Sequence, residues 1–337
     1  MHEEFEYNNK NNHIFFLILK ILLIFFIYFL LLNISYYKNL LLDINNQSIH
    51  NGINQIQNKL RVCICTLGKK ENNYIREYIR HYYQYGVDKI YLYDNNDIDG
   101  EKFETVISDY IEKKYVEIFN YRGKNAPQFK IFKNCYKNIY KMYDWLIFYD
   151  LDEYIHLENY SNIKDFLNKT IFKKCKAIYL NCMRHTDNNL IYYDNRPLAQ
   201  RFPEINWNSK MYTVKTIMRG NLKGIKFKTS HWLDRRIKGC DINGKMVIPS
   251  KKVKLNNSLI TSNFKKYYID HYCFKSTEEY INKLNKGDGI FGYNNSIRMH
   301  KINLYFNYNK LTLEKINFIE KRCKFNLTKF RIKLKNN

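Results

Sequence analysis

The sequence predicts an α/β protein in which a mostly parallel sheet is flanked by helices and preceded by an N-terminal transmembrane helix. Three observations support this fold class. Strand-like apolar segments alternate with helical periodicity from residue 61 to 149, residues 145–149 form a continuous apolar strand, and residues 14–32 are apolar on every helical face. A hydrophobic content of 45% and an aromatic content of 17% exclude a wholly disordered chain.

The first element is the apolar run at residues 14–32, which only Lys20 interrupts. A helix of this length spans a hydrocarbon core of about 30 Å. A cleaved signal peptide fits less well, because the run is long for such a segment and no A-x-A-like site follows it. We therefore expect a cytoplasmic tail at residues 1–13, a signal anchor at 14–32 and a stem at 33–60. This arrangement is typical of a single-pass type II membrane protein of the Golgi or endoplasmic reticulum with a lumenal domain. Several Asn-x-Ser/Thr sequons agree weakly with a lumenal glycoprotein.

Four strands are predicted next, at residues 61–66, 87–93, 115–121 and 145–149. Three helices are predicted between these strands. Tyrosines and isoleucines recur at helical spacing over residues 74–82, and Gly86 is expected to end that helix. The other two helices are expected at residues 103–113 and 127–143. A βαβαβαβ pattern implies parallel strands with right-handed crossovers. A further strand is expected at 177–182, and helical spacing returns at 277–284 and 311–321. We assign residues 61–300 to one domain and residues 301–337 to a basic helical tail.

The charge of the chain is strongly positive, since 56 Lys and Arg against 32 Asp and Glu give +24. From residue 298 onward there are eleven basic residues and two acidic ones. A membrane-tethered polyanion-binding protein without catalysis is therefore one functional hypothesis. Nucleic acid is the less plausible partner, because an anchored lumenal domain seldom meets it.

The eight cysteines contain no C-x-x-C pair, which disfavours a zinc ribbon or a thioredoxin-type motif. Cys63 and Cys65 alternate with apolar residues in a predicted strand, so both side chains are expected on one face. Burial as small hydrophobic side chains and disulfide formation in an oxidising lumen are both open.

An acidic cluster follows the fourth predicted strand and contains Asp150 and Asp152. In parallel sheets ligands bind beyond the carboxyl ends of the strands. A turn after Asp150 lets both carboxylates converge on one Mn²⁺ or Mg²⁺ ion, which can also bind a nucleotide diphosphate. The structural alternative is that one of the two aspartates only caps a turn. The functional alternative is a metal-dependent phosphoryl hydrolase, which would bind its metal ion through the same pair of aspartates.

Other candidates have equally simple alternatives. Asp94 ends the second strand and is placed to contact a ribose or base, or else to form an Asx-turn. His231 and His271 lie in aromatic surroundings, where a histidine is more often a packing residue than a ligand. Three lysines in or near a predicted helix complement phosphates or form a solvated basic face: Lys275, Lys283 and Lys286.

Five ordered blocks resemble glycosyltransferase family 92 and the related family 2-like transferases. They are KENNYIREYIRHYYQYGVDKIYLYDNN at 70–96, WLIFYDLDEYI at 145–155, NLIYYDNRPLAQRF at 189–202, VKTIMRG at 214–220 and DHYCFKSTEEYINKLNKGDG at 270–289. Together these blocks are spread over about residues 61–289, which is most of the expected lumenal chain. Two departures are Gly220, where the family often has proline, and the turn Lys70-Glu71-Asn72 in place of Asn-Glu.

The resemblance implies a GT-A fold and a metal-dependent inverting glycosyltransferase, a hexosyltransferase that moves a sugar, galactose being the usual one, from a UDP-sugar to a glycan or glycoconjugate acceptor. It implies that Mn²⁺ or Mg²⁺ is bound by Asp150, Asp152 and His271. It also implies that a further set of residues contacts the nucleotide sugar: Thr66, Glu71, Asp94, Asn95, Asp150, Lys275 and Ser276.

Inverting transfer needs a carboxylate base on the face of the sugar opposite the diphosphate. We predict Asp187 for this role, because it follows the strand at 177–182 near the expected acceptor entrance. Asp241 and Glu204 are the other candidates, and any of the three is otherwise an ordinary surface acid.

Overall fold

The computed structural model describes residues 60–125, 128–207, 213–227, 231, 236–247, 265–287, 295–323 and 325–336. The predicted cytoplasmic tail, the signal anchor at 14–32 and the stem up to residue 59 lie outside these ranges. Across the described ranges, none of the helices combines the length and the apolar character that a membrane span needs. Leu60–Asn337 form one compact unit.

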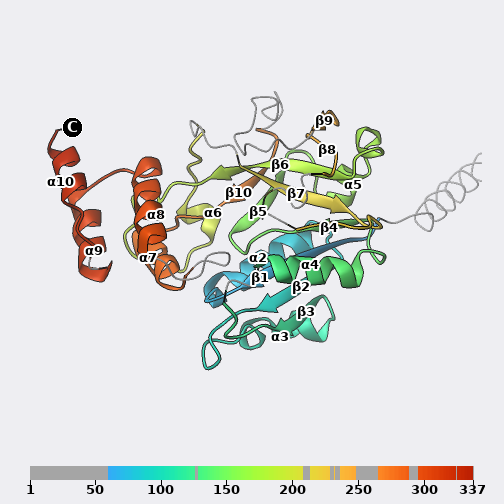
Figure 1. The fold of residues 1–337 in the computed structure, drawn as a ribbon, viewed down its shortest axis with the longest axis horizontal. Helices are drawn as coiled ribbons and strands as arrows, with labels where there is room; N and C mark the ends of the chain where they lie inside the picture. The colour runs from blue at the N-terminus through green and yellow to red at the C-terminus, as the bar shows by residue number, and fades with distance from the viewer. Residues whose placement is uncertain are drawn as a thin grey trace, which may run out of the picture. The chain divides into compact units, whose positions relative to one another are not determined.

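The amino-terminal half follows the predicted alternation of strands and helices (Figure 1). Its elements are β1 (Val62–Gly68), α2 (Asn72–Gln84), β2 (Lys89–Asp94), α3 (Glu104–Glu112), β3 (Val116–Asn120), α4 (Gln128–Ile139) and β4 (Trp145–Ile147). Strands β3, β2, β1 and β4 are neighbours in that order and pair in parallel. Gly86 ends the turn after α2 at a φ of +77°, a conformation that glycine adopts without strain.

The second half extends the same sheet with mixed strand directions. Its elements are β5 (Glu153–Leu157), α5 (Ile163–Leu167), a 3₁₀ turn (Thr170–Phe172), β6 (Ala177–Arg184), α6 (Leu198–Arg201), β7 (Val214–Arg219), β8 (Gly239–Cys240), β9 (Met246–Val247) and β10 (Tyr267–His271). The strand order is β3-β2-β1-β4-β7-β6-β10-β5, and β7 is antiparallel to both β4 and β6. The expected α/β fold with a central sheet is therefore present, but the sheet was expected to be mostly parallel and its second half is mixed, because β7 and β5 pair antiparallel with their neighbours.

Helices cover both faces of the parallel strands, which explains their continuous apolar sequence. On β1 the side chains of Val62 and Ile64 pack with α2, α3 and α5, while Cys63 and Cys65 face the core beneath α4. The prediction that both cysteines point to one face is confirmed. Cys65 is joined to Cys135 of α4, with 6.4 Å between the Cα atoms, and Cys175 is joined to Cys240.

Four helices follow the sheet: α7 (Thr277–Asn285), α8 (Asn295–Tyr308), α9 (Leu313–Cys323) and α10 (Thr328–Lys335) (Figure 1). They share a small apolar core of their own, which includes Ile302, Tyr305 and Ile316. Helix α8 continues across residue 300, the boundary drawn from the sequence. Thr277 Oγ1 lies 2.8 Å from the Tyr305 hydroxyl, so α7 and α8 are also joined by a buried polar contact.

Candidate functional site

The acidic cluster lies where β4 ends and β5 begins. One carboxylate oxygen from each of Asp150, Asp152 and Glu153 lies within 4.8 Å of the others. The turn is held by the Asp150 N–H, which donates to Glu153 Oε2 at 3.0 Å, and by the Glu153 N–H, which donates to the Asp150 carbonyl at 3.1 Å. The two aspartates therefore face one another rather than opposite sides of the chain.

Asp150 is held by two side chains from other elements. Lys215 Nζ lies 2.6 Å from Asp150 Oδ2 and 3.0 Å from Glu153 Oε2, and Gln128 Nε2 donates to Asp150 Oδ1 at 2.9 Å. Burial lowers the pKa of Lys215, but the charges of Asp150 and Glu153 together raise it by more, so the net shift of this pKa is upward. Lys215 is therefore a fixed positive charge beneath the cluster.

Asp152 is paired with Lys283 of α7, whose Nζ lies 2.6 Å from Asp152 Oδ2. The other oxygen, Oδ1, lies 3.6 Å from His271 Nε2. Burial alone raises the pKa of Asp152, but Lys283, His271 and Lys275 together lower it by more, so this carboxylate stays ionised. Burial also lowers the pKa of His271 well below its ordinary value, which leaves a neutral imidazole.

Glu153 and His271 are direct partners across the antiparallel pair β5 and β10. Glu153 Oε1 is 3.8 Å from His271 Nε2, and among the described residues it is a buried oxygen without a hydrogen-bond partner. Burial raises the pKa of Glu153, Lys215 offsets part of that rise, and the neighbouring aspartates add to it.

Three ligand atoms thus face one another and are not satisfied by a hydrogen bond to a lysine: Asp152 Oδ1, Glu153 Oε1 and His271 Nε2. Carboxylate oxygens suit Mn²⁺ and Mg²⁺, and a neutral imidazole is a metal ligand. The unpartnered Glu153 oxygen is an atom that a cation would satisfy. The residues present therefore fit a divalent cation.

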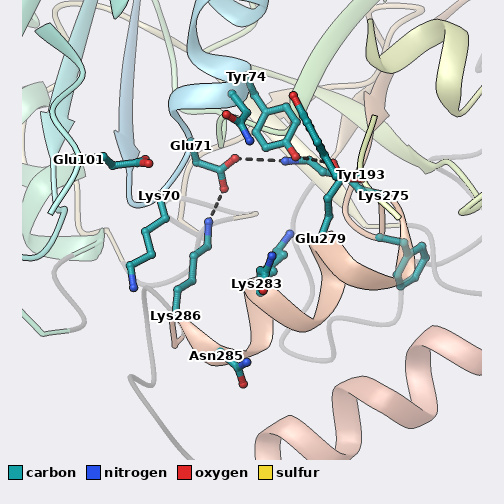
Figure 2. A pocket seen from close by; sticks show the side chains of 13 residues that line it. Lys70, Glu71, Tyr74, Glu101, Tyr193, Lys275, Glu279, Lys283, Asn285 and Lys286 are labelled. Carbon is teal, nitrogen blue, oxygen red and sulfur yellow. Dashed lines mark hydrogen bonds and ion pairs between the residues drawn. The ribbon is translucent and has the colours of Figure 1, made fainter. Parts of the chain in front are cut away.

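A pocket of about 420 Å³ adjoins this cluster, with Lys283 as the shared residue. The loop before α2, the start of that helix and the helix α7 supply most of its lining (Figure 2). The lining side chains are Lys70, Glu71, Asn73, Tyr74, Glu101, Tyr193, Phe274, Lys275, Glu279, Asn282, Lys283, Asn285 and Lys286. Four of these lining residues are lysines, and a cluster of positive charge attracts anions.

Glu71 lies between two of these lysines, as the dashed lines in Figure 2 show. Lys275 Nζ is 3.1 Å from Glu71 Oε2, and Lys286 pairs with the other carboxylate oxygen. Burial raises the pKa of Glu71, but Lys275 and Lys286 lower it by more. Lys275 also lies 3.3 Å from the centre of the Tyr74 ring, a cation–π contact that fixes its direction.

The other residues expected to contact the nucleotide sugar do not line this pocket. Thr66 is fully buried in β1. Asp94 Oδ1 accepts from the Asn96 N–H at 2.8 Å, which is the Asx-turn alternative, and Asp94 Oδ2 pairs with Arg122 at 2.6 Å. Asn95 donates its side-chain amide to the carbonyls of residues 121 and 124. These contacts give Asp94 and Asn95 a structural role, whereas Thr66 Oγ1 is buried without a hydrogen-bond partner among the described residues.

Ser276 and Asp187 also have structural partners. Ser276 is the N-cap of α7 and forms a capping box with Glu279. Asp187, the predicted base, is 1% exposed, and its Oδ2 accepts from Tyr305 and pairs with Lys315 at 2.5 Å. The structure therefore does not bring Asp187 to the pocket, because α8 and α9 cover its carboxylate.

The remaining candidates are similarly occupied or distant. Asp241 is buried in the turn between β8 and β9, where it accepts from the N–H groups of Asn243 and Lys245. Glu204 is exposed and accepts from Thr186 Oγ1 at 3.4 Å. His231 Nδ1 lies 3.1 Å from the carbonyl of Val214, so this histidine is a packing residue.

Sequence reasoning gave no role to three residues that complete the site: Gln128, Lys215 and Glu153. Lys215 carried a usable signal, because a lysine within the apolar strand VKTIMR requires a buried counter-charge. The pairing of Ile147 with Ile217 then places Lys215 level with the end of β4. Glu153 carried a weaker signal, since its neighbour across the sheet depends on an antiparallel pairing that periodicity does not reveal.

Three plant proteins resemble part of the chain. A glycosyltransferase family 92 protein of Ricinus communis is 30% identical over 108 residues, which is 31% of this chain and 18% of the relative. A protein of the same family from Oryza sativa is 26% identical over 106 residues, which is 32% of this chain and 18% of the relative. One from Arabidopsis thaliana is 28% identical over 102 residues, which is 29% of this chain and 17% of the relative. The matched segments thus span less than a fifth of these relatives.

Similar solved structures include TarS 1–349 of S. aureus in complex with UDP-GlcNAc, at 15% identity and a TM-score of 0.29 over 48% of this chain and 45% of that one. The mannosyltransferase PcManGT of Pyrobaculum calidifontis, in complex with GDP-Man and Mn²⁺, has 10% identity and a TM-score of 0.29 over 37% and 36%. TM-scores of this size do not establish a shared fold. The family assignment instead comes from the sequence profile of glycosyltransferase family 92, which matches residues 58–321; because this match covers most of the chain, the protein belongs to glycosyltransferase family 92.

Proposed function

We propose that this protein is a metal-dependent glycosyltransferase that moves a sugar from a nucleotide-sugar donor, a UDP-sugar by preference, to a glycan or glycoconjugate acceptor. The observation that carries the proposal is the convergence of Asp150, Asp152 and Glu153 beside a neutral His271 at the rim of the sheet. Family membership supports the same chemistry. We further propose that the sheet and its helices are a GT-A-type domain.

The cation, Mn²⁺ or Mg²⁺, is held by Asp152, His271 and Glu153, with Asp150 beside them. When bound, such an ion neutralises the charge that develops on a departing diphosphate. Lys215 fixes the direction of Asp150, and Lys283 keeps Asp152 ionised. The Asp152 carboxylate is thereby ionised and available to a cation while Lys283 is protonated.

The lysine-lined pocket is the place we propose for the donor's phosphates. Lys275, Lys283 and Lys286 belong to or flank α7, and all three point toward Glu71 or Asp152 from the same side as the pocket. A phosphate entering the pocket gains these ammonium groups as charge-assisted hydrogen-bond donors. Tyr193 offers an aromatic face and Asn282 an amide at the same pocket, and such groups suit a sugar or nucleoside.

The resemblance also carries three finer proposals: inversion at the anomeric carbon, galactose as the transferred sugar, and anchoring through residues 14–32 in the secretory pathway. Proton NMR of the product reports its anomeric configuration, and mass spectrometry of the product identifies the sugar. A protease-protection assay on microsomes that contain the full chain reports on which side of the membrane the domain lies.

The test of the proposal is a donor screen with the full chain. We expect a UDP-sugar to be consumed in the presence of Mn²⁺, with nucleotide release that EDTA stops. Asp152→Asn should reduce turnover at least about 100-fold, because a charge interaction worth several kcal/mol is lost.

The matched control is Asp109→Asn, which removes an exposed carboxylate of α3 that pairs with Arg76 outside the pocket. It should leave turnover unchanged. Full activity of Asp152→Asn, or equal activity with EDTA, contradicts the metal assignment. Phosphate release without sugar transfer favours a hydrolase, and polyanion binding without any sugar consumption favours the non-catalytic alternative.

A further inference from the structure

Three neighbouring strands bring a thiol, an imidazole and a carboxylate to the same face of the sheet. His271 of β10 is paired with Glu153 of β5, and Ile269, two residues earlier on the same face, is paired with Cys182 of β6. Because side chains alternate along a strand, Cys182, His271 and Glu153 must share one face. One ligand atom from each lies within 4.8 Å of the other two.

This triad contains unsatisfied polar atoms. Among the described residues, Glu153 Oε1 and His271 Nδ1 are buried without a hydrogen-bond partner. Cys182 is 2% exposed and Glu153 is fully buried. Buried polar atoms normally have partners, and a bound ion is one reason for leaving them open.

Cys182 is also left out of the disulfides. The structure joins Cys65 to Cys135 and Cys175 to Cys240, while Cys182 keeps a free thiol. His271 retains 16% side-chain exposure, so the triad has an open edge through which an ion can enter.

We propose that Glu153, Cys182 and His271 form a binding site for a thiophilic divalent cation, with Zn²⁺ as its natural match. Zinc takes thiolate, imidazole and carboxylate ligands and commonly leaves a fourth position to another group. On binding, the Cys182 thiol releases its proton to solvent and the sulfur becomes a metal ligand. Mn²⁺ and Mg²⁺ prefer oxygen ligands and have little use for this sulfur.

The site shares Glu153 and His271 with the cation site of the proposed function, so the two ions cannot be held together. Zinc is then an inhibitor that competes with Mn²⁺, a consequence that rests on the proposed function. The binding claim itself does not depend on that function, and its test needs no turnover.

The experiment is a titration of the reduced full chain with Co²⁺, a spectroscopic substitute for Zn²⁺. We expect a near-ultraviolet thiolate-to-cobalt charge-transfer band at one Co²⁺ per chain, which added Zn²⁺ removes. Cys182→Ser should abolish the band. Cys63→Ser is the matched control, because Cys63 is an equally buried free thiol that faces the opposite side of the sheet, and it should keep the band.

Cys273→Ser is a second control, since this thiol also lies near Asp152 but outside the triad. Loss of the band in Cys273→Ser rather than in Cys182→Ser overturns the assignment. Should Cys182→Ser fail to fold, zinc-edge X-ray absorption of the wild-type protein decides: one sulfur in the first shell supports the site, and a shell of oxygen and nitrogen alone overturns it. If Co²⁺ binds as expected but no nucleotide sugar is consumed with Mn²⁺, only the proposed function fails.

Discussion

Lys283 Nζ donates to Asp152 Oδ2 across 2.6 Å, although the two residues are 131 positions apart in the sequence. Burial lowers the pKa of Lys283, but the charge and hydrogen bond of Asp152, together with smaller contributions from Cys273 and Glu71, raise it by more; the same pairing helps to depress the pKa of Asp152. One ion pair therefore both ties α7 to the sheet rim and keeps the central carboxylate ionised.

Replacing Lys283 by methionine should destabilise the protein in a pH-dependent way. Breaking a buried pair costs about 3–5 kcal/mol, but Lys283 is 32% exposed, so solvent screening reduces this to about 1–2 kcal/mol. The pKa of Asp152 is lower in the folded than in the unfolded state, where it is about 3.9. The stabilisation from the Lys283–Asp152 pair is hence fully present above about pH 5. It is lost progressively as the pH falls below the pKa that Asp152 has in the unfolded state.

Urea unfolding of wild type and Lys283→Met between pH 7 and pH 3 measures this directly. The gap in free energy of unfolding should stay constant down to about pH 5 and narrow below about pH 4. Lys321→Met removes the same charge from an exposed position of α9 and should change stability by less than about 0.5 kcal/mol at any pH. A gap that widens on acidification contradicts the pairing.

Ser276→Ala should lower stability without weakening donor binding. The Ser276 side chain accepts from the Glu279 N–H at 3.3 Å, and Glu279 Oε2 accepts in return from the Ser276 N–H at 3.0 Å. Loss of such an N-cap costs about 1 kcal/mol. Thermal unfolding should show this loss, while Ser161→Ala, at an exposed serine, should not. A raised KM for the nucleotide sugar with unchanged stability would instead restore the ligand role.

The sequence was sufficient for the parallel half of the sheet, because each strand there is buried on both faces and each helix has one apolar side. The pattern from Val62 to Ile147 needs no distant contact to be recognised. It predicted much less of the antiparallel part. Strand β7 carries Lys215, and β10 ends in Asp270 and His271, so neither matches a simple buried-strand pattern.

For the candidate site, too, the sequence predicted some residues and not others. Asp150 and Asp152 were found because they directly follow a buried strand, and His271 came from the family resemblance. Their partners Lys215 and Lys283 come from distant segments, and only the folded sheet brings them together. Gly220 departs from the family's frequent proline for a local reason. Its N–H donates to the Asp144 carbonyl at 2.9 Å, which proline cannot do, and an added Cβ would lie 1.9 Å from the Tyr143 carbonyl oxygen.

Removing the bond between Cys65 and Cys135 should cost about 4 kcal/mol, because the bond closes a loop with a sequence separation of 70. The double variant Cys65→Ser and Cys135→Ser should show this loss in guanidinium unfolding. Peptide mapping without reduction should find the linked pair in the wild type. Cys63→Ser alters a buried thiol outside any disulfide and should cost clearly less. Equal losses in the two variants would mean that packing, not the crosslink, carries the stability.

The buried pair of Asp187 and Lys315 should prove structural. Both side chains are at most 2% exposed, and Tyr305 adds a hydrogen bond to the same Asp187 oxygen. Asp187→Asn leaves the Lys315 ammonium buried without a counter-charge, which costs about 3–5 kcal/mol. Adding Lys315→Met removes that orphaned charge, so the double variant should be more stable than Asp187→Asn alone, as chemical unfolding of all three variants will show.

The same variants separate this structural role from the predicted role of Asp187 as general base. A base acts on the acceptor hydroxyl and must reach it, whereas α8 and α9 cover Asp187 and its carboxylate already has partners on both oxygens. The folded fraction of Asp187→Asn should therefore keep its rate of nucleotide release within a few-fold of wild type. A large fall in kcat with unchanged stability would show that the helices move aside during the reaction and expose this carboxylate to the acceptor.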